Sequence, residues 1–233
     1  MMTMKVTMIL RNLDLLSQDP GAFILFMVLL LTALVASFTV HEFSHALVAT
    51  TLGDNTAARL GRLSLNPRVH LDPAGSFMVL LAGFGWGKPV PVNPRAFGTK
   101  ALHHMMLVAV AGPLANFALA LSIIVLFKIG FVDGIALLPL HASASAVIGQ
   151  FLAITLFLNL VLGLFNLIPL APLDGSSVML GLLPREMAYR LARFEHFGPR
   201  ILMGIILLDI FANTGIISTI IDVPLNIILK AIQ

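Results

Sequence analysis

The stretch AFILFMVLLLTALVASFTVHEFSHALVAT, residues 22–50, contains one charged residue, Glu42, among mainly apolar side chains. A helix needs roughly 20 apolar residues to cross the hydrocarbon core of a bilayer, so this stretch predicts a membrane-spanning helix. Further apolar runs predict spans over about 103–128, 145–168 and 201–221, and Asn213 and Gly215 interrupt the last of these. We therefore expect an all-α integral membrane protein with about four full transmembrane helices.

The composition of the whole chain supports this fold class. Of its 233 residues, 58% are hydrophobic and only 11% are charged, whereas soluble domains carry roughly 25% charged residues. The chain has no cysteine, which excludes disulfides and thiolate metal ligands. We divide it into an N-terminal lead-in (1–21), a transmembrane core (22–221) and a C-terminal interfacial segment (222–233).

Between the first two spans, the apolar run 75–84 is too short to cross a membrane. It leads into GWGKPVPVNP (85–94), which predicts a re-entrant or interfacial hairpin. The segment 88–92 either offers an edge strand to a substrate or covers the site as a loop. His70, in the preceding loop, either forms a loop hydrogen bond or lines the site.

The cationic residues predict the orientation in the cell membrane. Of the 14 Lys and Arg residues, most lie on one side of the expected spans: Arg59, Arg62, Arg68, Lys88, Arg95, Lys100, Arg185, Arg190, Arg193 and Arg200. By the positive-inside rule this side is cytoplasmic and the N-terminus lies outside. The net charge of +3 then reflects basic loops, and we expect no nucleic-acid partner.

The sequence HEFSH (41–45) near the end of the first span matches the pattern HExxH. Residues four apart lie on one face of a helix, so His41 and His45 can present both imidazoles to one metal ion. Glu42 can then reach a water on that ion. Three ionisable groups inside an apolar helix are costly unless they are functional or paired, although a polar cluster that ties helices together is the alternative.

A catalytic zinc ion usually has three protein ligands and an open position for water. Asp174 in PLDG (172–175) follows the third span and lies at the same side of the membrane as His41 and His45. It is therefore a candidate third ligand. A turn aspartate before Gly175 is the alternative, since Asp-Gly is an ordinary turn pair.

Three motifs in this order, HEFSH (41–45), AGPLAN (111–116) and NLIPLAPLDG (166–175), resemble the site-2 protease family of intramembrane zinc metalloproteases. The loop sequences LGRLSLNPRVHLDPAGS (60–76) and GWGKPVPVNP (85–94) resemble its short prokaryotic members. Unlike many members, this chain has no room for a PDZ domain or a pair of CBS domains.

The resemblance implies one zinc ion per chain, held by His41, His45 and Asp174, with Glu42 as general base. It also implies that Asn166 lies near the site and that Asn116 reaches a polar group there. Either asparagine contacts substrate or supports the site, or it forms an ordinary helix-end or interhelical hydrogen bond. The implied activity is cleavage of transmembrane segments of membrane proteins. A metal-ion transporter or channel and a catalytically inactive binding module are the alternatives.

Overall fold

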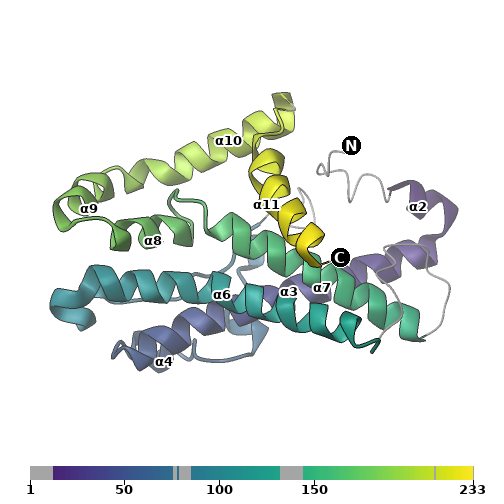
Figure 1. Cartoon of the computed structure of the whole chain (residues 1–233), viewed down its shortest axis with the longest axis horizontal. Coiled ribbons are helices and arrows are strands. Elements are labelled where there is room, and N and C mark those ends of the chain that lie inside the picture. Colours follow the sequence, from purple (N-terminus) through teal and green to yellow (C-terminus); the bar gives the residue numbers. More distant parts are fainter. Residues whose placement is uncertain (1–12, 76–77, 79–84, 132–143, 213, 233) are drawn as a thin grey trace.

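The computed structural model describes residues 13–75, 78, 85–131, 144–212 and 214–232, and this part of the chain is helical apart from its loops. Figure 1 shows the arrangement of the elements, which have the following bounds: α2 (Leu13–Gln18), α3 (Pro20–Thr51), α4 (Thr56–Arg59), η1 (Pro67–Val69), η2 (Pro94–Lys100), α6 (Ala101–Lys128), α7 (Ala144–Asn166), α8 (Asp174–Leu182), α9 (Arg185–Ala192), η3 (Glu195–Phe197), α10 (Gly198–Ala212) and α11 (Ile216–Ile232).

Three helical stretches in the described part are long and apolar enough to cross a membrane. They are α3, the continuous stretch Pro94–Lys128 that contains α6, and Ser145–Asn166 within α7. These agree with the first three predicted spans. The described part of the chain is thus helical, and its three candidate membrane-spanning helices indicate a multi-pass membrane protein.

Local sequence signals set the ends of α3. Asp19 accepts a hydrogen bond on its side chain from the main-chain N–H of Ala22 (3.0 Å), and Pro20 occupies the first helical turn, as expected at a helix N-terminus. After Thr51 the chain turns at Gly53, whose φ of 106° is easily adopted only without a Cβ atom. At 1.5 Å per residue, α3 is about 48 Å long, so it extends beyond a hydrocarbon core of about 30 Å or tilts within it.

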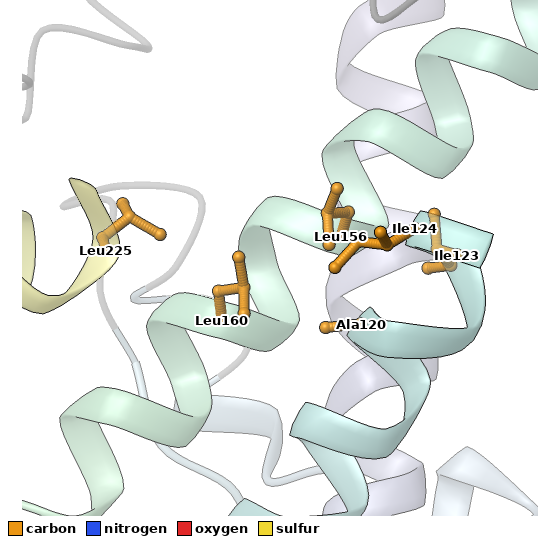
Figure 2. Packing of buried hydrophobic residues seen from close by; sticks show 6 residues of the cluster. All are labelled: Ala120, Ile123, Ile124, Leu156, Leu160 and Leu225. Atoms are coloured by element: carbon orange, nitrogen blue, oxygen red, sulfur yellow. The ribbon is translucent and has the colours of Figure 1, made fainter. Parts of the chain in front are cut away.

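The bundle is built around α6. This helix packs against α3, α7 and α8, while α3 also packs against α7, and α11 lies against α7. Figure 2 shows the apolar cluster along α7, which packs against α6 and α11; it is formed by Ala120, Ile123, Ile124, Leu156, Leu160 and Leu225. Because α6 is shared by three neighbours, its polar residues can reach groups on each of them.

The expected fourth span over 201–221 is interrupted where the sequence predicted a break. The structure has two helices here: α10, which ends at Ala212, and α11, which begins at Ile216. Gly215 adopts a φ of 69° between them. The Asp209 side chain stabilises this break, since it accepts hydrogen bonds from the Thr214 hydroxyl and the Ile216 N–H, both over 2.8 Å.

The predicted re-entrant hairpin lies partly outside the described residues, at 76–77 and 79–84. Where the chain is described, Leu71 and Gly87 form an isolated antiparallel bridge. Lys88 also donates its main-chain N–H to the carbonyl of His70 over 2.7 Å. The chain at 70–71 and the chain at 87–88 therefore lie side by side, and the predicted hairpin itself stays a prediction.

Candidate metal centre

The two histidines of HEFSH point to one place from successive turns of α3. Their Nε2 atoms lie 3.0 Å apart, and the side chains are buried, with exposed fractions of 3% for His41 and 7% for His45. The intervening turn also brings a carboxylate oxygen of Glu42 near, since the donor atoms of all three residues lie within 4.8 Å of one another. The helical spacing thus produces the cluster that it predicted.

The hydrogen bonds of the imidazoles determine which nitrogen faces this cluster. His45 Nδ1 lies 2.7 Å from the carbonyl oxygen of Val108, and a carbonyl can only accept, so Nδ1 carries the hydrogen. His41 Nδ1 lies 2.6 Å from Oδ1 of Asn116 and likewise donates. In neutral imidazoles the two Nε2 atoms then have no hydrogen and direct their lone pairs toward each other.

Asp174 approaches the same place from the first turn of α8. Its Oδ2 lies 3.1 Å from His41 Nε2 and 3.3 Å from His45 Nε2. This oxygen is buried, yet no hydrogen bond satisfies it within the described residues. Three lone-pair atoms therefore face one another without a hydrogen between them, an arrangement that is repulsive unless a positive charge lies among them.

The donor set fits a divalent metal ion. Donors about 2.0–2.1 Å from a tetrahedral zinc ion lie about 3.3 Å apart, close to the 3.0, 3.1 and 3.3 Å that separate these three atoms. Two imidazoles and a carboxylate are also a ligand combination found in zinc enzymes. Asp174, rather than Glu42, makes the tight contacts with both histidines.

A buried network of amide side chains orients His41. Asn116 accepts from His41, and its Nδ2 donates to Oδ1 of Asn159 (2.7 Å) and to the carbonyl of Ser37 (3.2 Å). Asn159 in turn donates to the Ser37 hydroxyl (2.8 Å) and to the carbonyl of Thr155 (2.8 Å). Because both donors of Asn116 are used elsewhere, its oxygen must face the histidine. Hydrogen bonds of this kind fix the tautomer of a metal-binding imidazole.

Two glycines allow the helices to approach the cluster. A Cβ atom on Gly112 of α6 would lie 2.5 Å from Nε2 of His45 and 2.7 Å from Cε1 of His41. A Cβ atom on Gly175 would lie 2.3 Å from the carbonyl oxygen of Leu167. Both distances are far below van der Waals contact. Close packing therefore requires glycine where AGPLAN passes the histidines and after Asp174.

The structure separates the two asparagines that the sequence suggested for the site. Asn116, fully buried, contacts His41. Asn166 donates its side-chain N–H to the carbonyl of Leu162 in its own helix, over 2.9 Å, a helix-end hydrogen bond. Sequence reasoning missed Asn159, which the structure shows to be fully buried. An asparagine within an apolar span is itself a signal, because such a polar group needs hydrogen-bond partners.

Beyond the end of α3, Asp54 anchors the loops beside the site. Its side chain is almost fully buried and accepts hydrogen bonds from the Thr56 hydroxyl (2.5 Å), the Thr56 N–H (3.0 Å) and the Asn93 N–H (2.6 Å). Burial by itself would raise the pKa of Asp54, but these hydrogen bonds outweigh it and hold the pKa below its ordinary value. The ionised carboxylate thus joins the loop after α3 to the loop before α6.

The family model described as peptidase family M50 matches residues 128–208. The protein named "Putative zinc metalloprotease YwhC" of Bacillus subtilis is 44% identical over 169 residues, which cover 72% of this chain and 75% of that protein. The chain belongs to peptidase family M50. This is the site-2 protease family that the motifs indicated, so the expected family and enzyme class are confirmed.

Other M50 relatives align over similar lengths. The protein named "Putative zinc metalloprotease Rip2" of Mycobacterium tuberculosis is 30% identical over 184 residues, covering 77% of this chain and 66% of that protein. Its namesake in Mycolicibacterium smegmatis is 28% identical over 182 residues, with the same shares. No solved structure matches the chain. The M50 family model covers Asp174 but not HEFSH, so the roles of individual residues rest on the geometry above.

Proposed function

We propose that this M50 protein is a zinc-dependent intramembrane metalloendopeptidase that cleaves transmembrane segments of membrane proteins. His41, His45 and Asp174 hold one zinc ion per chain, and Glu42 is the general base. The observation that carries the proposal is the convergence of three buried lone-pair atoms, 3.0–3.3 Å apart, beside a carboxylate within an apolar bundle.

The chain's own residues divide the work of hydrolysis. A bound zinc ion supplies Lewis-acid chemistry, because it makes water acidic near neutral pH and polarises a peptide carbonyl. Glu42 takes a proton from the attacking water and returns it to the leaving amine. Asn116 holds His41 in one tautomer, and the Val108 carbonyl does the same for His45, so both Nε2 atoms stay free to bind the ion.

The location of the cluster supports a membrane-embedded substrate and a cytoplasmic site. His41 and His45 lie ten and six residues before the end of α3 at Thr51, or about 15 and 9 Å along its axis. The loops beyond that end carry most of the arginines and lysines, so this side is cytoplasmic and the N-terminus is outside. A substrate helix must unwind to expose a carbonyl, which favours segments with helix-breaking residues.

The test uses detergent-purified protein returned to proteoliposomes with a tagged single-span protein whose transmembrane segment contains Gly or Pro. We expect about one zinc ion per chain in wild type and its loss in Asp174→Ala. Glu42→Gln should keep the metal and lose cleavage, whereas the control Glu186→Gln, on exposed α9, should keep both.

Each variant can contradict a different part of the proposal. Cleavage retained by Glu42→Gln would remove the general base, and full metal content in Asp174→Ala would remove the third ligand. A wild-type protein that binds zinc and moves cations, but cleaves no protein, would favour a transporter or channel instead.

A further inference from the structure

A main-chain N–H group contacts the general base of the proposed reaction. Val90 donates its N–H to Oε2 of Glu42 over 3.2 Å. Pro89 and Pro91 on either side have no N–H, so Val90 carries the only main-chain donor in residues 89–91. Val90 precedes a proline, which restricts it to extended conformations. The direction of the donor is therefore limited by the sequence around it.

Contacts on the upstream side hold Val90 in place. Lys88 donates its N–H to the carbonyl of His70 over 2.7 Å. Gly87 passes so close to α3 that a Cβ atom there would lie 2.1 Å from Cζ of Phe38. The His70 side chain is fully buried and its Nε2–H donates to the carbonyl of Ser64 over 2.7 Å, so the partner of Lys88 is itself fixed.

The downstream side is held as well. Asn93, three residues after Val90, donates its N–H to the carboxylate of Asp54 over 2.6 Å, and Asp54 follows the end of α3. The segment is therefore attached on both sides of Val90 to chain that adjoins α3. The Val90 N–H reaches Glu42 as part of a rigid structure, rather than as a loop that happens to lie there.

A general base needs an oriented carboxylate. Glu42 has a flexible side chain, and proton transfer requires an oxygen within about 2.6–3.2 Å of the proton's carrier. A hydrogen bond to one oxygen leaves the other free and limits the side chain to few rotamers. The donor also lies outside the three residues proposed to bind the ion.

We propose that the main-chain N–H of Val90 is a positioning group for catalysis: it fixes Oε2 of Glu42 so that Oε1 takes the proton from water and delivers it to the leaving amine. This inference rests on the proposed function. It assigns to Glu42 the one main-chain N–H between Lys88 and Val92, because Pro89 and Pro91 have none.

The rival explanation is that the contact only attaches the segment to α3. The two explanations differ in what loss of the N–H changes. Loss of an attachment lowers stability or substrate binding, whereas loss of a positioning group lowers kcat while KM, zinc content and melting temperature stay near wild type. A hydrogen bond to a charged group is worth enough to change kcat about 10- to 100-fold.

The experiment compares three replacements at one position in the proteoliposome cleavage assay. Val90→Ala shortens the side chain but keeps the N–H, and we expect kcat close to wild type. Replacement of Val90 by its α-hydroxy acid, introduced by nonsense suppression, exchanges the main-chain N–H for an ester oxygen and keeps the side chain. We expect kcat to fall about 10- to 100-fold with KM and zinc content unchanged. Val90→Pro removes the same N–H donor by an ordinary substitution, and its kcat should fall by a similar factor.

The proposal is overturned if the kcat of the α-hydroxy-acid protein lies within a few-fold of the kcat of Val90→Ala. It is also overturned if the α-hydroxy acid changes only KM, zinc content or stability. If Val90→Pro does not fold, the α-hydroxy-acid protein decides. Failure of the proposed function looks different, because then wild type and Glu42→Gln cleave equally or not at all, and both proposals fall together.

Discussion

The substitution Gly112→Ala tests the geometry of the metal centre most directly. The added Cβ would lie 2.5 Å from Nε2 of His45, 2.6 Å from its Cε1 and 2.7 Å from Cε1 of His41. Atoms of this kind rest at about 3.5 Å or more. The rings, or α3 itself, must therefore move by roughly 1 Å.

This displacement exceeds what a metal site tolerates. Ligand distances in a working site vary by about 0.2 Å, so a shift of roughly 1 Å should abolish binding. The cost to folding should be smaller: overpacking costs about 1–3 kcal/mol, and alanine regains up to about 1 kcal/mol of helix propensity over glycine. We expect a folded protein with little or no zinc and no cleavage activity.

The assay is zinc content by mass spectrometry together with thermal unfolding in detergent. Gly204→Ala is the matched control, because this glycine also lies in a helix and a Cβ there would have no heavy atom within 4 Å. The control should keep its zinc and its stability. Full zinc content and normal activity in Gly112→Ala would refute the close packing of α6 on the two histidines.

Three further predictions concern residues around the centre. Asn116→Leu leaves the Nδ1–H of His41 without its acceptor, so zinc affinity, measured by chelator competition, should fall about 10- to 100-fold; unchanged affinity would show that the amide does not orient the ring. Gly175→Ala would bring a Cβ 2.3 Å from a carbonyl oxygen and displace Asp174, so zinc content should fall while the helical circular dichroism signal persists; normal zinc content would contradict this. Asp54→Asn should lower stability at pH 7 by about 1–2 kcal/mol. Because the pKa of Asp54 is lowered in the folded protein, its contribution is complete above the ordinary value of about 3.9 and is lost as the pH falls below it. Melting temperatures of wild type and Asp54→Asn should therefore converge in acid, and a constant difference from pH 7 to pH 3 would exclude the ionised carboxylate as the cause.

Much of this protein follows from its sequence because the deciding signals are local. Apolar runs predict α3, α6 and α7, since a helix is the structure that satisfies its own main-chain hydrogen bonds in lipid. The spacing of His41 and His45 places both imidazoles on one face of α3 whatever surrounds that helix. The same local reasoning predicts the break in the span 201–221 at Gly215, but it does not predict that the Asp209 side chain stabilises this break.

The tertiary structure decided which distant groups meet these side chains. The sequence offered both Asn116 and Asn166 as candidates, yet one contacts His41 and the other bonds within its own helix. Nothing local identifies the carbonyl of Val108 as the partner of His45, or the N–H of Val90 as the partner of Glu42. Such contacts depend on the rotation and axial offset of packed helices, which are set by the fit of whole surfaces, whereas residue spacing fixes only what one helix presents.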